Sequence, residues 1–313
     1  MPQAIVYTEF GGPEVLTLTE VPVPTPGAGE IAVLVEAAGV NPIDGKLRSG
    51  LRASGALTGP RGVGADLGGV VTAVGADVDG FRVGDPVAAF GVHGAYATDV
   101  VVPADRAHVR PANVSAAQAA ALGIPIGTAY QTVRSLGVGA GDTLLVHGGS
   151  GSVGQAVIQF AVLWGATVVG TSSEQRFDRV HELGAVPVAY GEGLADRLRE
   201  AAPQGITAII DAAGTDEALQ TSIELLADKS RIATLVRGRD AADLGIRAFS
   251  GGSPIPLTPQ QQAWRAEAVP VALALLAAGA FSVELGESFP LAEAARAHEA
   301  VENGAAGKVV LVP

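Results

Sequence analysis

The glycine-rich segment 144–156 constrains the fold more than any other part of this sequence. Its glycines Gly148, Gly151 and Gly154 are spaced as Gly-x-x-Gly-x-x-Gly, between an apolar strand pattern and a helical pattern. Glycine permits a tight turn and a close approach of the backbone to a pyrophosphate, and a helix that begins there directs free N–H groups at the phosphates. This context predicts a dinucleotide-binding unit, and the alternative is a tight turn without a ligand.

The composition bounds the class of protein. A chain of 313 residues suggests two domains, and 48% hydrophobic against 17% charged residues excludes a disordered protein. The lack of cysteine excludes disulfides, thiolate metal sites and thiol nucleophiles. A net charge of −12 argues against nucleic acid or an anionic membrane as partner. The longest apolar run, 268–281, is shorter than the roughly 20 residues of a membrane span, and no targeting segment is visible, so a cytoplasmic protein is expected.

The pattern of apolar residues changes near Ser115. Before it, short β-branched runs between glycine, proline and aspartate predict a barrel or sandwich. After it, strand and helix patterns alternate, which predicts a parallel sheet with helices on both faces. Strands are expected at 31–36, 70–74, 86–90, 96–102, 144–147, 167–170, 186–189, 208–211, 231–235 and 308–312. Helices are expected at 115–122, 153–164, 174–183, 194–202, 216–226, 266–278 and 291–303, the first with Ser115 as N-cap.

The end of the second strand of the alternating part indicates which dinucleotide is bound. An NAD site places an acidic residue there, on the ribose 2′-hydroxyl. This chain has Ser172 and Ser173, followed by Arg176, and these hydroxyls and this cation suit a 2′-phosphate. The sequence therefore favours NADPH over NADH, with a solvated helix arginine as the alternative for Arg176.

The sequence gives little support for a catalytic metal site or for a catalytic nucleophile. The five histidines lie more than ten residues apart from each other, and no Gly-x-Ser-x-Gly elbow is present, so neither a catalytic zinc nor a hydrolase site is expected. A redox reaction carried by a cofactor needs neither. His147, directly before the glycine loop, either contacts the cofactor or packs at the end of its strand.

The chain resembles the zinc-independent medium-chain dehydrogenase/reductases, in particular the quinone oxidoreductases related to zeta-crystallin and the enone reductases. The matching segments, in order, are 11–16, 38–44, 64–71, 83–87, 124–131, 147–154, 183–185, 211–214 and 307–311. The zinc-dependent relatives carry Gly-His-Glu where this chain has Gly64-Ala65-Asp66. The resemblance implies a GroES-like β-barrel domain of residues 1–121 and 264–313, a Rossmann domain of residues 122–263 with a doubly wound parallel sheet, and a homodimer.

The resemblance also implies roles for single residues. Asn41 matches an asparagine near the nicotinamide, or is a turn residue before Pro42, and Asp44 beside it has a structural role. Lys46 holds the substrate carbonyl or is a solvated lysine, and it stands where relatives close to zeta-crystallin have a tyrosine, which favours enones or enals. Thr128 approaches the nicotinamide; with Asn41 and Lys46 it makes up the expected catalytic set.

The expected cofactor-binding set joins the glycine loop to the family positions. Tyr190 is expected near the adenosine phosphate or as a half-buried aromatic, and Lys308 is either a basic residue near the cofactor or part of a plain edge strand. The full set is Asn41, Thr128, Gly148, Ser150, Gly151, Ser152, Val153, Gly154, Ser172, Ser173, Arg176, Tyr190, Ala213 and Lys308.

These observations predict an NADPH-dependent reductase of quinones or conjugated carbonyls that works without metal. Two alternatives stay open, namely a zinc-free alcohol or ketone reductase and a non-catalytic NADPH-binding sensor or structural protein. Segment 237–262 is rich in glycine and proline and has no assignable pattern, and it is expected to line the substrate site.

Overall fold

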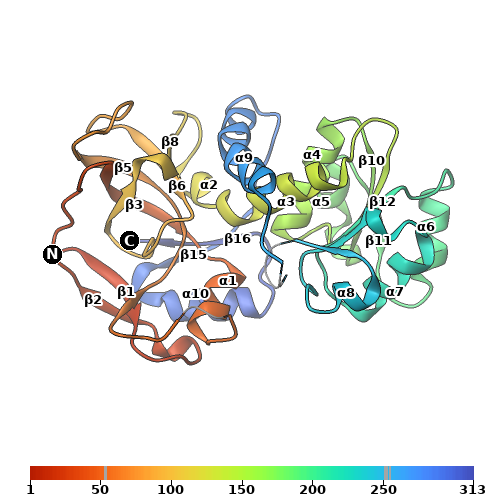
Figure 1. The fold of residues 1–313 in the computed structure, drawn as a ribbon, viewed down its shortest axis with the longest axis horizontal. Helices are drawn as coiled ribbons and strands as arrows, with labels where there is room; N and C mark the ends of the chain where they lie inside the picture. Colours follow the sequence, from red (N-terminus) through yellow and green to blue (C-terminus); the bar gives the residue numbers. More distant parts are fainter. Residues whose placement is uncertain (53–54, 250–252, 254) are drawn as a thin grey trace. The chain divides into compact units, whose positions relative to one another are not determined.

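The computed structural model describes residues 1–52, 55–249, 253 and 255–313 of the chain. They form two compact units, shown in Figure 1. The first unit comprises Met1–Ile124 and Val269–Pro313, and the second unit comprises Pro125–Ala268. Each unit has its own sheet and its own hydrophobic core.

The first unit is built on a seven-stranded, mostly antiparallel sheet in the order β15-β16-β3-β5-β6-β8, with β7 paired to β3. Its strands are β3 (Glu30–Gly39), β5 (Asp66–Val74), β6 (Pro86–Phe90), β7 (Asp99–Pro103), β8 (Ala107–Val109), β15 (Leu285–Pro290) and β16 (Lys308–Val312). A smaller sheet contains β1 (Gln3–Tyr7), β2 (Thr17–Glu20) and β4 (Arg61–Gly62).

One core serves both parts of the chain that build the first unit. Val33, Leu67 and Val87, from β3, β5 and β6, share a buried cluster with Val309 and Leu311 of β16. Removing a side chain of this kind from water stabilises a fold by about 1.5–3 kcal/mol. The C-terminal strand is therefore part of the core of the first unit.

The helices of the first unit include one that the sequence analysis missed. Helix α1 (Pro42–Arg48) begins with proline at its first position and is stabilised by Asp44, whose carboxylate accepts a hydrogen bond from the Asn41 main-chain N–H. The remaining helical segments are η1 (Pro13–Val15), η2 (Ala104–Arg106), α2 (Ala116–Ala120), η5 (Leu291–Glu293) and α10 (Ala294–Glu302). Helix α2 has the expected N-cap, because the Ser115 hydroxyl accepts from the Gln118 N–H at 3.1 Å.

Several expected boundaries in the first unit were wrong. The strand expected at 31–36 spans Glu30–Gly39, and the strand expected at 70–74 begins at Asp66. The strand expected at 96–102 begins only at Asp99. Before it, Tyr96 forms main-chain hydrogen bonds with Ile5 and Val63 instead of joining the ladder. The helix expected at 291–303 starts with the 3₁₀ turn η5 and becomes α-helical at Ala294.

The second unit contains a six-stranded parallel sheet in the order β11-β10-β9-β12-β13-β14, which confirms the doubly wound fold. Its strands are β9 (Thr143–His147), β10 (Thr167–Ser172), β11 (Val186–Ala189), β12 (Ala208–Asp211), β13 (Ile232–Thr234) and β14 (Arg247–Ala248). Its helices include α4 (Ser152–Leu163), η3 (Glu174–Arg176), α5 (Phe177–Glu182), α6 (Leu194–Ala201), α7 (Asp216–Leu225), η4 (Lys229–Arg231) and α8 (Ala241–Leu244).

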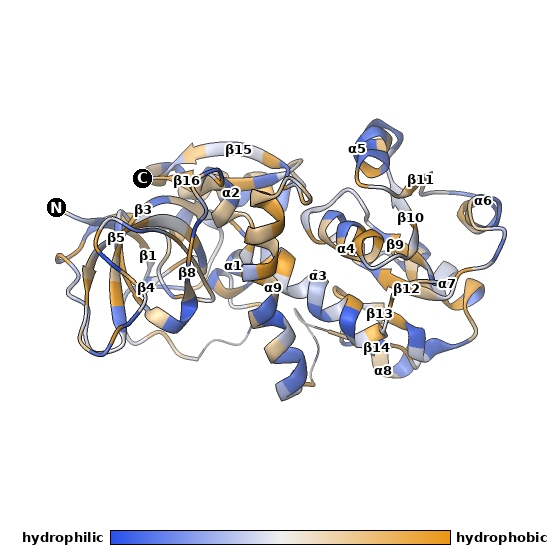
Figure 2. Cartoon of the chain, turned by 90° about the horizontal axis from the view of Figure 1, so that it is seen from above, coloured by the Kyte–Doolittle hydropathy of each residue, from blue (hydrophilic) through white to orange (hydrophobic). Residues whose placement is uncertain are grey.

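Helices cover both faces of this parallel sheet. On one face, Leu198 of α6 and Leu219 of α7 pack in one cluster with Leu145 of β9. On the other face, Val180 of α5 and Ile158 of α4 pack against β10, where a Cβ on Gly170 would lie 3.0 and 3.4 Å from their side chains. Figure 2 shows hydrophobic colouring along β9 and α4. Burial on both faces explains why these strands are short, continuous apolar runs.

Segment 237–262 has more regular structure than the sequence analysis found. It contains α8, β14 and the start of α9 (Pro259–Ala277), while residues 250–252 and 254 lie outside the described part. Helix α9 begins seven residues before the expected start at 266, because Thr258 and Gln261 form a capping box, with bonds of 3.3 and 2.9 Å. The helix expected at 174–183 also begins differently, with the 3₁₀ turn η3. The boundaries of the two units fall within α9 and within α3 (Gly123–Leu136).

No described helix is long and apolar enough to cross a membrane.

Candidate functional site

The glycine loop joins β9 to α4 at the carboxyl end of the parallel sheet. Gly148 has φ of +75°, which favours glycine, and a Cβ on Gly154 would lie 2.1 Å from the Gly148 carbonyl oxygen. Gly151 is the N-cap of α4 and offers no side chain to its first N–H groups, so the helix begins uncapped. The loop residues Ser150, Ser152 and Val153 lie between these glycines and are partly exposed. The three glycines therefore serve the turn, the open helix start and the close packing of helix on loop.

The first N–H of the loop forms a hydrogen bond with a side chain of β10. Gly148 N donates to Thr171 Oγ1 at 3.2 Å, and Thr171 Oγ1 lies 3.4 Å from His147 Nδ1. Burial lowers the pKa of His147 to about 4, although the Asp211 and Glu217 carboxylates oppose this, so the imidazole is neutral at pH 7. His147 thus packs at the strand end and supports the loop through Thr171, while its Nε2 has no hydrogen-bond partner among the described residues.

The expected phosphate-binding residues follow two neighbouring strands. Ser172 ends β10 and pairs in register with Ala189, the last residue of β11, so Tyr190 follows at the same edge of the sheet. Ser172 is buried, and its hydroxyl donates to the Ser173 carbonyl at 3.1 Å. Ser173 and Arg176 are partly exposed in the turn η3, and Tyr190 is 60% exposed.

The strand β12 ends in a carboxylate that the sequence analysis did not single out. Asp211 Oδ1 accepts from the N–H groups of Ala213 and Gly214 at 3.0 and 2.8 Å, and its Oδ2 accepts from Thr234 Oγ1 at 2.8 Å. The Ala213 N–H is therefore already bonded within the protein. An acidic residue directly before Ala-Ala-Gly at a strand end was the available signal.

Thr128 lies on α3 in the second unit and is buried. Its hydroxyl accepts a hydrogen bond from Arg265 of α9 at 2.6 Å, and its carbonyl accepts one from Thr132 at 2.8 Å. The partner Arg265 could not be anticipated, because 137 positions of sequence separate the two residues.

A buried polar cluster lies in the first unit where three adjacent strands of its larger sheet have their ends side by side. Asn41 follows the end of β3, Asp66 begins β5 and Lys308 begins β16. The register places Gly39 opposite both Asp66 and Val310, so these three ends meet. With Asp44 and Tyr96 these residues form what we call the Asn41 cluster. All five are at most 3% exposed.

The hydrogen bonds of the Asn41 cluster use both ends of the Asn41 amide. Asn41 Nδ2 donates to Asp66 Oδ2 at 2.8 Å and to the Gly39 carbonyl at 3.4 Å, and the Lys308 ammonium donates to Asn41 Oδ1. Asp44 Oδ2 accepts from the Asn41 main-chain N–H and from the Tyr96 hydroxyl, each at 2.9 Å. The structure therefore brings two sequence-predicted residues, Asn41 and Lys308, into direct contact.

Burial controls the charges of this cluster. It raises the pKa of Asp44 to about 6, with a further rise from the Asp66 carboxylate and an opposing effect of the hydrogen bonds from Asn41 and Tyr96. Burial also raises the pKa of Asp66, which Lys308 counteracts, and lowers the pKa of Lys308, which both carboxylates counteract. The pKa of Tyr96 is raised well above 10 by burial and by Asp44, so its hydroxyl is a poor acid.

A second buried group adjoins the Asn41 cluster. Arg48 of α1 forms an ion pair with Glu302 at 2.8 Å and donates to His298 Nδ1 at 2.9 Å. The Tyr96 ring packs edge-on against His298 with centroids 5.8 Å apart. Because arginine only donates, His298 accepts at Nδ1 and is neutral; burial, with a contribution from Arg48, lowers its pKa to about 4.

Lys46 differs from the other expected catalytic residues. It lies on α1, five positions after Asn41, and its side chain is exposed, in contrast to the buried Asn41 and Lys308. The structure therefore groups Asn41 with Lys308 and leaves Lys46 on the surface.

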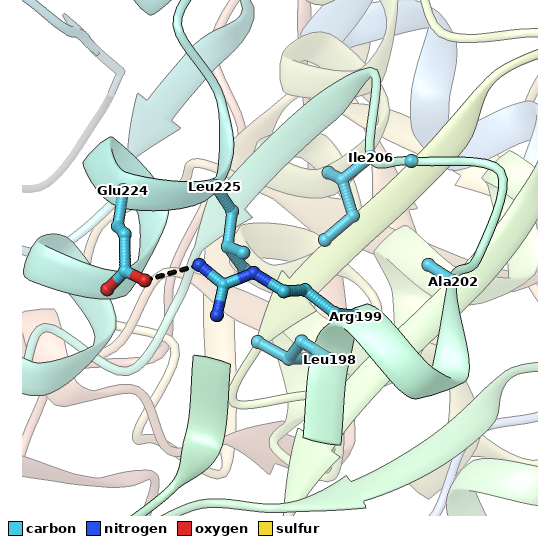
Figure 3. Close-up of a pocket in the computed structure, with 7 residues that line it drawn as sticks. Leu198, Arg199, Ala202, Ile206, Glu224 and Leu225 are labelled. Carbon is cyan, nitrogen blue, oxygen red and sulfur yellow. Dashed lines mark hydrogen bonds and ion pairs between the residues drawn. The ribbon is translucent and has the colours of Figure 1, made fainter. Parts of the chain in front are cut away.

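A small surface pocket of about 150 Å³ lies elsewhere in the second unit (Figure 3). The Arg199–Glu224 ion pair crosses it, and Ile206 lines it just before β12 begins. It therefore lies at the amino end of the strands, opposite the glycine loop, and its described lining contains no sequence-predicted site residue.

Two family models match the chain, one described as an alcohol dehydrogenase GroES-like domain at residues 27–112 and one as a zinc-binding dehydrogenase at residues 152–249. A zinc site uses cysteine, histidine or carboxylate ligands. The chain has no cysteine, and the described residues contain no group of three histidine, aspartate or glutamate side chains that could hold a metal ion. The described residues therefore offer no ligand set that fits a zinc ion.

The chain is similar over its whole length to proteins of one group. It is 33% identical to a pig (Sus scrofa) quinone oxidoreductase, over 99% of this chain and 97% of the relative. An Escherichia coli quinone oxidoreductase solved in complex with NADPH superimposes with a TM-score of 0.84 at 28% identity, covering 99% of this chain and 100% of the other. A solved NAD-dependent alcohol dehydrogenase has the same TM-score at 31% identity, with 99% of each chain covered. The chain therefore belongs to the medium-chain dehydrogenase/reductase family and, within it, to the quinone oxidoreductases.

Proposed function

We propose that this protein is an NADPH-dependent oxidoreductase that transfers hydride to quinones or to α,β-unsaturated carbonyl compounds without a metal ion. The observation that supports this most is the glycine loop, which leaves the start of α4 uncapped at the carboxyl end of a parallel sheet. Such an edge is where dinucleotides bind in open α/β sheets. The NADPH complex of the E. coli relative supports the same cofactor.

The loop suits the pyrophosphate of NADPH. Its exposed glycine, Gly151, has only the Gly148 carbonyl, at 3.6 Å, near the position of a Cβ, so a phosphate can approach the backbone. The N–H groups of Ser152 and Val153 begin the helix and carry its positive end. Residues Gly148, Ser150 and Gly154 complete the loop that would hold this group.

The choice of NADPH over NADH rests on the ends of β10 and β11. Ser172 is buried and its hydroxyl is used internally, so we assign the 2′-phosphate contacts to Ser173, Arg176 and Tyr190. Arginine forms charge-assisted hydrogen bonds with phosphate oxygens. No carboxylate ends β10, where one would repel the phosphate.

The chemistry follows from what NADPH supplies when bound, which is a hydride from C4 of its nicotinamide. An enone or enal would accept the hydride at its β-carbon, and a quinone would accept it on its conjugated ring system. A proton from solvent then completes the saturated carbonyl compound or the hydroquinone, and NADP⁺ is left. Asn41 and Lys46 are the candidates for stabilising the negative charge on the acceptor oxygen, and Thr128 for contacting the nicotinamide. Resonance spreads that charge, so no metal is required.

The alcohol dehydrogenase among the similar structures favours one alternative, a zinc-free alcohol or ketone reductase. Reducing an isolated carbonyl creates a localised alkoxide, which normally needs a metal or a positioned acid. The buried hydroxyl of the Asn41 cluster, Tyr96, is a poor acid because its pKa is raised well above 10. This ranks carbonyl reduction below conjugate reduction.

We also propose a small-molecule acceptor as the substrate and a homodimer that pairs an edge strand of the parallel sheet. The sheet ends in β11 on one side and β14 on the other, and either edge offers unpaired main-chain groups. Light scattering after size exclusion tests the dimer, and a monomer at micromolar concentration would contradict it.

Turnover tests the proposed function. Loss of NADPH absorbance is followed with a panel of quinones, enones and enals, and with saturated ketones and aldehydes as matched controls. We expect oxidation of NADPH with conjugated acceptors and little with the controls. Binding of NADPH without turnover of any acceptor would instead support a sensor or structural protein.

A further inference from the structure

The Asn41 side chain is held by two opposite charges that are themselves buried. Asp66 is 0% exposed and Lys308 is 3% exposed, and each contacts one end of the same amide group. Burying a charge is expensive unless it is paired and hydrogen-bonded. Such an arrangement therefore calls for an explanation beyond packing.

The two charges determine which way the Asn41 amide points. An ammonium group can only donate hydrogen bonds, and a carboxylate can only accept them. Oδ1 must therefore face Lys308 and Nδ2 must face Asp66. In the flipped amide, Nδ2 would face the ammonium group, so two donors would meet, and Oδ1 would face the carboxylate, so two acceptors would meet. Lys308 and Asp66 thus select one of the two orientations.

The cluster also leaves one part of this amide weakly bonded. One Nδ2 hydrogen is taken by Asp66 at 2.8 Å, while the other reaches the Gly39 carbonyl only at 3.4 Å, near the limit of a hydrogen bond. The bond from Lys308 to Oδ1 polarises the amide and makes its N–H groups stronger donors. This second N–H can exchange the Gly39 carbonyl for the carbonyl oxygen of a substrate at little cost in free energy.

Asp66 is in turn fixed by the start of α3. The Ile124 N–H donates to Asp66 Oδ2 at 3.1 Å, and a Cβ on Gly123 would lie 2.0 Å from Asp66 Oδ1. The positive end of a helix favours a carboxylate at this place. Gly123 therefore gives Asp66 room for its position beside Asn41.

We propose that Asp66 and Lys308 are positioning residues for hydride transfer, acting through Asn41 by fixing the orientation and the donor strength of its amide. This inference rests on the proposed function and adds two residues to it. Lys308, expected at first to bind the cofactor directly, acts here one step away, and Asp66 joins the site for the first time.

The test is a double-mutant cycle on kcat with NADPH and the best quinone or enone. Lys308→Met removes the charge and keeps an unbranched chain of similar length, and Lys229→Met is its matched control on the surface of the second unit. We expect Lys308→Met to lower kcat about 10- to 100-fold, as misplaced catalytic groups do. In an Asn41→Ala background the same change should lower kcat less than about twofold. Equal losses in both backgrounds, or an unchanged kcat in the first, would overturn the proposal.

A neutral double variant separates positioning from stability. Asp66→Asn with Lys308→Met removes both charges that contact the Asn41 amide, so neither is left without its partner, and it serves as the test if the single variant fails to fold. We expect its melting temperature to recover toward that of the wild type while kcat stays low, because the ammonium group that orients Oδ1 and polarises the amide is gone. Recovery of kcat along with the melting temperature would show a purely structural pair and refute the positioning role.

The same measurements distinguish a failure of the proposed function from a failure of the positioning role. An inactive wild type with every acceptor overturns both proposals. An active wild type whose Lys308→Met variant keeps its kcat overturns the positioning role alone. NADPH affinity, measured by fluorescence titration, should change less than about threefold in the variants of Asp66 and Lys308, because the proposal places both residues behind Asn41 and the glycine loop is untouched.

Discussion

Asn41 and Lys308 lie 267 positions apart in the sequence and share a buried hydrogen bond, from the lysine ammonium to the amide oxygen. They meet because β16 pairs with β3, whose end carries Asn41. The C-terminal strand therefore contributes to the candidate site as well as to the core. A lysine in an apolar strand is explained by this partner and by the nearby Asp66 carboxylate.

The contact between Gly123 and Asp66 predicts a strong coupling. Gly123→Ala should lower the free energy of unfolding by about 1–3 kcal/mol, as overpacking does, because the new methyl group overlaps the carboxylate. In an Asp66→Ala background the same change should be neutral or stabilising by at most about 1 kcal/mol, the helix preference of alanine. Denaturant unfolding of the four proteins measures both steps, and equal effects in the two backgrounds would rule out the contact.

Arg176 is predicted to distinguish the two dinucleotides. Arg176→Ala removes a charge-assisted contact worth about 1.5–3 kcal/mol, so the Kd for NADPH should rise about 10- to 100-fold while that for NADH changes little. Arg82→Ala, at a position that is exposed in the first unit, is the matched control. Fluorescence titration with both nucleotides gives the answer. An equal loss for NADH and NADPH would contradict the assignment of the 2′-phosphate.

Two glycines of the loop should respond differently to alanine. A Cβ on Gly154 would lie 2.1 Å from the Gly148 carbonyl, so Gly154→Ala should reduce the melting temperature. Gly151 is exposed with 3.6 Å of clearance, so Gly151→Ala should fold normally and lose NADPH affinity instead. Thermal melting and titration together separate the two effects. Normal NADPH binding by a folded Gly151→Ala protein would argue against phosphate contact at this loop.

His298 should make stability depend on pH. Its folded pKa of about 4 lies below the ordinary value of 6.5, so the unfolded chain binds more protons between these values. The stability that neutral His298 contributes is present above pH 6.5 and is lost as the pH falls toward 4, by up to about 3 kcal/mol. His298→Asn keeps an acceptor for Arg48 and should lose less stability over that range.

The comparison of wild type with His298→Asn isolates this residue. His147 has a similarly lowered pKa and contributes the same dependence in both proteins, whereas the raised pKa of Asp44 contributes the opposite sign in both. Denaturant unfolding at pH 7 and pH 5 measures the difference. Identical changes of the two proteins between these pH values would contradict a neutral, buried His298.

Local patterns were enough to predict the parallel sheet and the glycine loop. The strand before Gly148, the turn and the helix are continuous in sequence, and their spacing follows from backbone geometry. Helix α1 was missed because Asn41 before Pro42 also suits a simple turn. Helix α9 was placed late because its polar first turn depends on the Thr258 capping box.

The long-range partners of the site could not be predicted in this way. Asp66 contacts Asn41 from 25 positions away, and Arg265 contacts Thr128 from 137 positions away. Such pairs depend on sheet register and helix packing, which composition and periodicity do not encode. The only local signal was a charged residue at the start of an apolar strand, at Asp66 and again at Lys308.

The central claim is conjugate hydride transfer from NADPH, and the position of the transferred hydrogen tests it most directly. The protein is incubated with NADPH deuterated at C4 of the nicotinamide and an enone, and the product is analysed by NMR and mass spectrometry. Both C4 positions are labelled in turn, so that either face of the nicotinamide is covered. We predict deuterium on the β-carbon of a saturated ketone, whereas deuterium on the carbonyl carbon of an alcohol would contradict the account.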